Sequence, residues 1–181
     1  DALSQAVKLD PHLAEAWFRL GVVYALVEKR DQEREMVREE EDNSDPKKPS
    51  KTNSEKAFEK AVATYKKIVA ANEEDHLSYY NLGRAYNKLN EHEDAAKALK
   101  QAVKLNPEDT EYQTELGAIL IKLAQYHEAI QPLKKAIELD PDNIRAQELL
   151  EDAEAGRKRI NYSSTPREEK RRPGESPNSG N

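Results

Sequence analysis

Apolar side chains recur three and four residues apart along most of the chain, which is the spacing of amphipathic helices. One short pattern consists of a large residue, a Leu-Gly pair that starts three positions later, and Tyr or Leu at the eighth position. It occurs at Trp17–Tyr24, at Tyr79–Tyr86 and at Gln113–Leu120, and the second and third copies are 34 residues apart. Since positions i, i+3 and i+7 share one face of a helix, each copy predicts a helix with a single packing stripe.

A second pattern follows each of the last two copies. It consists of two alanines with a leucine between them at helical spacing, and then a proline that ends the helix. The residues of the two occurrences match at an interval of 34: Ala95, Leu99, Ala102 and Pro107, and then Ala129, Leu133, Ala136 and Pro141. The chain is therefore predicted to alternate between two kinds of helix.

Each copy of the first pattern places a glycine inside its predicted helix, at Gly21, Gly83 and Gly117. A glycine within a helix costs about 1 kcal/mol relative to alanine. A partner helix that approaches too closely to leave room for a Cβ would offset this cost. We expect small residues of the second helix to face the glycine, namely Ala95 and Ala102 in one pair and Ala129 and Ala136 in the next.

Together these residues resemble the tetratricopeptide repeat, a helix–turn–helix unit with the pattern W-x2-L-G-x2-Y, then A-x3-F, then P. The stretch Trp17–Tyr24 carries the complete first half of that pattern. The resemblance implies an all-α fold, in which antiparallel helix pairs form a right-handed superhelix. It also implies a binding scaffold rather than a reaction centre.

Counted on this period, residues 1–159 form one repeat domain. Its predicted parts are a half repeat at 1–9, repeats at 14–72, 76–106 and 110–140, and a capping helix at 143–159. The half repeat holds Leu3 and Ala6 where a second helix carries its apolar pair, so we expect the chain to be a fragment of a longer array. The capping helix has Gln147, Glu151 and Glu154 in slots that are aromatic, glycine or tyrosine elsewhere, which is the polar face that ends an array.

The first repeat is interrupted by a predicted insertion at 28–53. Its small-residue slot is expected near position 33, yet the matching Ala61 and Tyr65 lie 28 residues further on. The charge-dense part, 28–42, could prolong the first helix, and the following part, 43–54, predicts a flexible loop. Thr52 and Glu55 predict a capping box that restarts the helix. Two interpretations stay open: a tolerated surface insertion, or a dedicated contact element.

Composition narrows the functional classes. The tail at 160–181 has almost nothing to bury and a basic bias, which predicts disorder. The whole chain is acidic, with a net charge of −6 and a pI near 5.4, so nucleic acid is not an expected partner. Cysteine is absent, which excludes disulfides and zinc–thiolate sites. No apolar run approaches the roughly 18 residues of a membrane span. We expect a soluble protein, with the cytoplasm slightly favoured over the periplasm.

The sequence offers no reaction centre. The four histidines, His12, His76, His92 and His127, form no short-spaced pair, so no metal site is expected. There is no nucleophile elbow and no glycine-rich phosphate loop, and the carboxylates lie among basic neighbours. We therefore expect neither enzyme activity nor a cofactor.

The resemblance implies that the first helices of the repeats line a concave groove, with slots 2, 5, 9, 12 and 13 facing it. We expect apolar and aromatic residues there to form an exposed strip bordered by positive charge, which would suit a partner with an acidic group. As an alternative, Val22 and Leu26 pack against the inserted segment or an upstream repeat. The groove residues are Phe18, Val22, Leu26, Tyr80, Arg84, Asn87, Lys88, Ala118, Ile121 and Lys122.

A separate set of side chains is assigned to packing between helices: Trp17, Leu20, Tyr24, Tyr79, Leu82 and Tyr86. One variant of the family, the carboxylate clamp that binds chaperone C-termini, is doubtful because only Asn81 matches its pattern. The predicted function is a non-enzymatic protein–protein interaction scaffold or adaptor that holds a partner peptide or helix in the groove. The alternatives are a targeting or regulatory segment of a larger enzyme or assembly machine, and a module that associates with itself.

Overall fold

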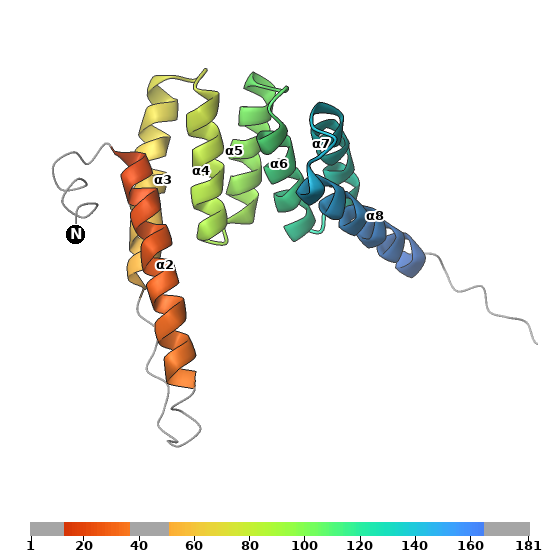
Figure 1. The fold of residues 1–181 in the computed structure, drawn as a ribbon. Helices are drawn as coiled ribbons and strands as arrows, with labels where there is room; N and C mark the ends of the chain where they lie inside the picture. Colours follow the sequence, from red (N-terminus) through yellow and green to blue (C-terminus); the bar gives the residue numbers. More distant parts are fainter. Residues whose placement is uncertain (1–12, 37–50, 165–181) are drawn as a thin grey trace, which may run out of the picture.

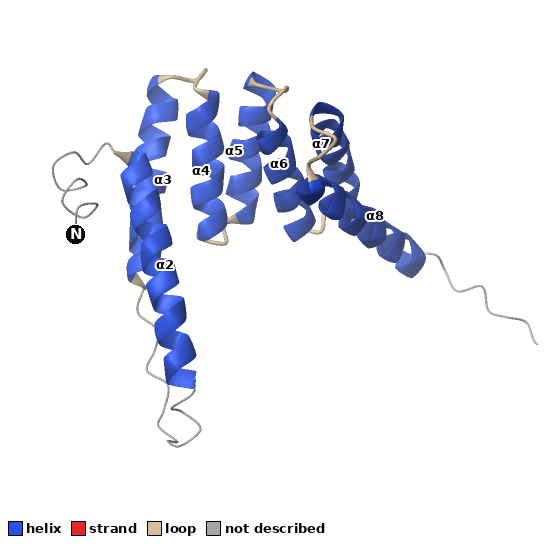
Figure 2. Cartoon of the chain, in the orientation of Figure 1, coloured by secondary structure: helices blue, strands red, loops and turns tan. Residues whose placement is uncertain are grey.

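The computed structural model describes residues 13–36 and 51–164, and every regular element in these ranges is an α helix (Figures 1 and 2). The helices are α2 (Ala14–Met36), α3 (Asn53–Ala71), α4 (His76–Lys88), α5 (His92–Leu105), α6 (Thr110–Lys122), α7 (Tyr126–Leu139) and α8 (Ile144–Ser164). The predicted half repeat at 1–9, the part of the predicted insertion at 37–50 and the part of the tail from 165 onward lie outside the described residues.

The helices pack as antiparallel pairs in chain order: α2 with α3, α4 with α5, and α6 with α7. Each pair contacts the next through its second helix, and α8 packs against both α6 and α7. Figure 1 shows the resulting row, with α2 at one end and α8 at the other. The predicted all-α array of helix pairs is confirmed. None of the described helices is both long and apolar enough to cross a membrane.

Side-chain caps begin the helices where the sequence places short polar residues. Thr52 and Glu55 form the predicted capping box at the start of α3. Asp75 and Asp109, 34 residues apart, accept backbone N–H bonds at the starts of α4 and α6. The repeated spacing of these caps fixes where the first helix of each pair begins.

The turn between α4 and α5 has the same conformation as the turn between α6 and α7. Asn90 follows α4 with φ 60°, and Ala124 follows α6 with φ 57°. In each turn the next N–H reaches back into the helix, from Glu91 to the Tyr86 carbonyl at 3.0 Å and from Gln125 to the Leu120 carbonyl at 2.8 Å. Asparagine tolerates this left-handed backbone, whereas alanine is strained in it.

The glycines sit where a second helix approaches closely, as predicted. A Cβ on Gly83 would lie 2.6 Å from Leu99 Cγ, and one on Gly117 would lie 2.4 Å from Leu133 Cγ. The side chain that occupies the vacant space is therefore a leucine. The expectation that alanines face the glycine holds for Ala95, whose carbonyl oxygen would lie 3.2 Å from a Cβ on Gly83, but the alanine side chains do not fill the space. The four alanines are fully buried instead at other positions of the same interfaces: Ala95, Ala102, Ala129 and Ala136.

The first pair has a different register. A Cβ on Gly21 would lie 2.7 Å from Phe58 Cε1, so Phe58 stands where Leu99 and Leu133 stand in the later pairs. When the repeats are aligned by sequence, with Ala61 matched to Ala95, Tyr65 is the residue predicted for that position. Tyr65 lies seven residues further along α3, and this prediction is wrong. Seven residues are two helical turns, so both residues lie on the same face of α3. Sequence periodicity cannot tell them apart.

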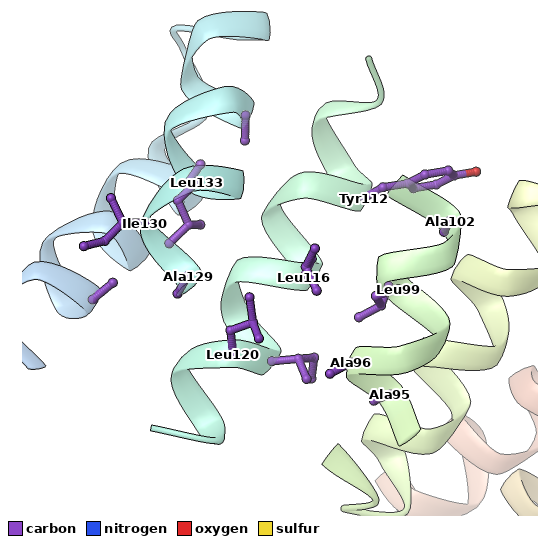
Figure 3. Close-up of a cluster of buried hydrophobic side chains, with 14 of the residues drawn as sticks. Ala95, Ala96, Leu99, Ala102, Tyr112, Leu116, Leu120, Ala129, Ile130 and Leu133 are labelled. Atoms are coloured by element: carbon purple, nitrogen blue, oxygen red, sulfur yellow. The ribbon is translucent and has the colours of Figure 1, made fainter. Parts of the chain in front are cut away.

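The core is a series of interfaces along the row rather than one central cluster. One set of buried side chains joins α4 to α8, and a second joins α2, α3, α4 and α5. Figure 3 shows part of the first set, with Leu99 of α5 and Leu133 of α7 on either side of Leu116 and Leu120 of α6. Each helix is held mainly by its immediate neighbours, as in other repeat arrays.

Candidate functional site

The ten predicted groove residues lie on α2, α4 and α6, and two of them are buried. Phe18 and Tyr80 retain 5% and 4% of their accessible surface. Phe18 packs edge-on against Phe58, with ring centroids 5.6 Å apart, and Tyr80 stacks on Tyr112 at 4.5 Å. The expectation of an exposed strip is therefore wrong for these two rings. The slot pattern places them on the correct helices but does not show that neighbouring helices cover them.

Arg84 lies over both buried rings. Its guanidinium carbon is 4.9 Å from the centroid of Phe18 on α2 and 5.4 Å from that of Tyr80 on its own helix. The side chain is half-buried, and it forms no ion pair with any described residue. Stacking on aromatic faces holds the planar guanidinium in place without neutralising it. Arg84 is thus a positioned cation between α2 and α4.

Two tyrosine hydroxyls bind carboxylates on neighbouring helices. Tyr80 donates to Glu111 Oε1 at 2.5 Å, and Tyr65 donates to Glu15 Oε2 at 3.0 Å. Burial, followed by the hydrogen bond to Glu111, raises the pKa of Tyr80 well above its ordinary value. Burial and the charge of Glu15 likewise raise the pKa of Tyr65. Both tyrosines therefore remain protonated and act as structural donors.

Further polar bonds join successive first helices. Lys122 Nζ donates to Asn87 Oδ1 at 2.7 Å, which links α6 to α4. Arg145 Nη1 donates to Glu115 Oε1 at 2.6 Å, which links α8 to α6. Sequence reasoning included Lys122 and Asn87 in the groove but did not predict that they bind each other. Their slots mark a shared face, whereas the contact depends on how far apart the two helices lie.

The remaining groove residues are at least partly accessible. Val22 and Ile121 are half-buried and pack against the two cores. The alternative that Val22 and Leu26 pack against the inserted segment or an upstream repeat stays a prediction. Ala118 is also half-buried, and Lys88 is exposed. Leu26 is the most open apolar member at 65% exposure, and Val23 at 46% lies beside it on α2. We call the surface of α2, α4 and α6 that carries Leu26, Arg84 and Lys122 the front face.

We consider three recesses elsewhere among the described helices. Two are lined by the side chains that were assigned to packing: Trp17, Leu20 and Tyr24 in one, and Tyr79, Leu82 and Tyr86 in the other. The third lies at the α6–α7 turn beside Arg157 and Ile160 of α8. Leu20 and Leu82 are buried as predicted, but the four aromatic side chains are only half-buried. No cluster of three potential metal ligands occurs in the described ranges.

Residues 55–101 and 80–144 match the family model described as tetratricopeptide repeat. The chain belongs to the tetratricopeptide repeat family. No curated protein matches the chain. Its fold, as the resemblance implied, is the superhelical array of antiparallel helix pairs of this family.

Solved tetratricopeptide repeat structures resemble this one. The second such domain of human RPAP3, in complex with the HSP70 peptide SGPTIEEVD, is 27% identical and covers 55% of this chain and 83% of its own, with a TM-score of 0.52. The first domain of Spaghetti (RPAP3), bound to the HSP90 peptide SRMEEVD, is 25% identical and covers 56% and 80%, with a TM-score of 0.53. The MamA protein is 22% identical and covers 90% and 73%, with a TM-score of 0.58, and supports the fold alone.

Proposed function

We propose that this repeat array is a protein-interaction scaffold that binds an acidic peptide or helix of a partner protein on the front face. The observation that carries the proposal is Arg84, a half-buried guanidinium held over two aromatic rings without a carboxylate partner among the described residues. A guanidinium fixed in this way can bind a carboxylate through two parallel hydrogen bonds at little further entropic cost.

The other charges of the front face favour the same kind of partner. Its acidic side chains are engaged within the array: Glu15 binds Arg19 and Tyr65, Glu111 binds Tyr80, and Glu115 binds Arg145. Lys88 on α4 is exposed and forms no ion pair with a described residue. Lys122 binds only the neutral amide of Asn87, so its charge is not compensated there. The positive charges left available to a ligand therefore lie around Arg84.

Apolar contacts are available beside these cations. Leu26 and Val23 are exposed on α2, and Leu77 at the start of α4 is 54% exposed. An acidic segment with one or two apolar side chains could use these contacts for affinity, while charge sets orientation and association rate.

The solved relatives support this proposal by analogy. The two RPAP3 domains hold peptides that end in Glu-Glu-Val-Asp. This chain matches only one position of the carboxylate-clamp pattern, Asn81, so we propose that Arg84 rather than a clamp provides the main acidic contact. Domains of this family generally act in protein interaction and not in catalysis, and we propose no reaction for this chain.

Affinity capture from the native source, followed by mass spectrometry, tests the proposal. The bait would be the full chain and its Arg84→Gln/Lys88→Gln variant. The matched control is Lys104→Gln/Lys134→Gln, which removes the same charge from exposed positions on α5 and α7. A partner recovered with wild type and control but lost with the Arg84/Lys88 variant supports the front face. Recovery with all three baits contradicts it.

The two alternative functions give different results. If the chain associates with itself, light scattering will show a dimer that depends on concentration and is weakened by Leu26→Ser. If the chain is a targeting or regulatory segment, the captured partner will copurify with an activity that resides in another part of the same assembly.

A further inference from the structure

The largest of the three recesses, about 340 Å³, lies between the second helices α3 and α5, with α4 beneath it. Lys66 and Val69 of α3, Tyr79, Leu82 and Tyr86 of α4, and Asp94, Lys97, Ala98 and Gln101 of α5 line it. We call it the α3–α5 recess. Its volume is at the lower end of the range for ligand pockets and suits one large side chain. No residue of the recess belongs to the predicted groove set.

The recess is apolar at its base and aromatic at its sides. Leu82 and Ala98 are each 6% exposed and belong to the core between α3, α4 and α5. Tyr79 and Tyr86 stand above them and are half-buried, so part of each ring is open to a ligand. Tyrosine combines a large apolar area with little conformational entropy, which is why it is frequent at binding sites.

The same slots form a recess in the preceding helix pair. This recess has a volume of about 290 Å³ and is lined by Trp17, Leu20 and Tyr24. Lys60 Nζ lies 4.1 Å from the centroid of the Trp17 ring. In the third copy the slots hold Gln113, Leu116 and Leu120, which are at most 6% exposed, and the Gln113 amide donates to the Pro107 carbonyl. These recesses therefore depend on aromatic side chains at the first and last positions of the pattern, rather than on the fold alone.

Charge identifies the kind of partner. The second helices α3, α5 and α7 carry nine lysines and six acidic residues, in a chain whose net charge is −6. At the α3–α5 recess, Lys97 is paired with Asp94 at 2.8 Å, whereas Lys66 forms no ion pair with a described residue. The edge of an apolar recess thus keeps an uncompensated positive charge.

We propose that the α3–α5 recess is a second docking site, which takes one large apolar side chain from a partner segment that is acidic on both sides of it. The apolar side chain contacts Tyr79, Leu82 and Tyr86, and a flanking carboxylate pairs with Lys66. Because the front face and this recess share no residue, the array can hold two segments at once. The inference does not depend on the front-face proposal.

Nuclear magnetic resonance on the uniformly ¹⁵N-labelled full chain tests this site. The probe is the blocked peptide acetyl-Asp-Asp-Phe-Asp-Asp-amide, which has no free terminal carboxylate. Control peptides replace Phe by Ala, or the four acids by lysines. We expect saturable shift changes at the amides around Val69, Tyr79 and Ala98, and at least about tenfold weaker binding for both control peptides.

Variants of the chain separate the recess from general charge attraction. Lys66→Glu reverses the charge at its edge, and Gln101→Trp fills it from the partly exposed side of α5. The matched control is Lys134→Glu, which reverses the charge of an exposed lysine on the second helix α7 but lines none of the three recesses. We expect Lys66→Glu and Gln101→Trp each to weaken peptide binding about tenfold, and Lys134→Glu to leave it within twofold.

Three results would overturn the proposal. One is the absence of shift changes at α3–α5 with millimolar peptide. Another is a set of shift changes on α2, α4 and α6 that Arg84→Gln abolishes, which would place the peptide on the front face. The third is equal weakening by Lys66→Glu and Lys134→Glu, which would show attraction to the lysines without a site.

Discussion

The ring of Phe58 fills the space that the missing side chain of Gly21 leaves, and a Cβ at that position would lie 2.7 Å from Phe58 Cε1. In the later pairs Leu99 and Leu133 have this role, each six residues before the end of its helix, whereas Phe58 lies 13 residues before the end of α3. The contact of the first pair is therefore two helical turns further from the end of its second helix. Together with the length of α2, which is 23 residues against 13 in α4, this offset accounts for the way α2 extends past the end of α4 in Figure 1.

A double-mutant cycle tests the offset register. Gly21→Ala forces the Phe58 ring to move, so we expect it to lower the free energy of unfolding, and Phe58→Leu should relieve part of this loss. The expected coupling energy between the two changes is about 1 kcal/mol, measured by urea denaturation. Tyr65→Leu is the control, and its coupling to Gly21→Ala should be near zero. If Gly21→Ala were coupled to Tyr65→Leu instead of Phe58→Leu, the result would contradict the observed register and support the one that the alignment of the repeats predicts.

The turn at Ala124 offers a stabilising substitution. Ala124 has a left-handed backbone, with φ 57°, at an exposed position. Relief of this strain by Ala124→Gly should raise the free energy of unfolding by roughly 0.5–1 kcal/mol. The same substitution at exposed Ala63 within α3 should lower it by about 1 kcal/mol. Thermal unfolding followed by circular dichroism checks both signs, and a loss of stability at Ala124 would contradict the argument.

Glu28 joins the middle of α2 to the start of α3. Its carboxylate accepts hydrogen bonds from the Asn53 N–H at 2.8 Å, the Ser54 N–H at 3.1 Å and the Ser54 hydroxyl at 2.5 Å. Burial tends to raise the pKa of Glu28, but the bonds from Ser54, Thr52 and Asn53 together lower it below 4.5. Its contribution to stability is therefore present above pH 4.5 and is lost as pH falls through the lowered pKa.

We expect Glu28→Gln to lower the free energy of unfolding by about 1 kcal/mol at pH 7, which is the usual effect of losing a helix cap. The difference from wild type should shrink as the pH falls below 4.5. Denaturation curves from pH 7 to pH 3 measure this trend. Exposed Glu33→Gln, on the same helix, serves as the control and should show little effect at any of these pH values.

Several features could be predicted from the sequence because they repeat or are local. The 34-residue period predicts the helix pairs, and Thr52 with Glu55 predicts a capping box that the structure contains. The burial of Phe18 and Tyr80 could not be predicted in this way. Slot position specifies which side of its own helix a residue occupies, whereas burial depends on Phe58 and Tyr112, which come from neighbouring helices. The register of the first pair escaped prediction for a similar reason, since a shift of seven residues leaves the helical face unchanged.

The burial of Tyr80 changes what its substitution would mean. Tyr80→Phe removes the hydroxyl bond to Glu111 but keeps the stacked ring, so we expect a loss of about 1.5–3 kcal/mol in the free energy of unfolding. Tyr80→Ala should lose about 3–5 kcal/mol, because it also leaves a cavity beside Tyr112 and removes a ring from under Arg84. Chemical denaturation of the two variants compares these losses. Equal losses would show that the ring contributes nothing beyond the hydroxyl.

Site-specific photo-crosslinking tests most directly the claim that a partner binds the front face. A benzophenone amino acid would replace exposed Lys88 on α4 in one chain and exposed Lys134 on α7 in the other, and both would be irradiated in extract of the native source. Our account predicts a crosslinked partner peptide from position 88 that is absent at position 134 and lost when Arg84→Gln is added. A partner that crosslinks only from position 134, or equally from both positions, would contradict it.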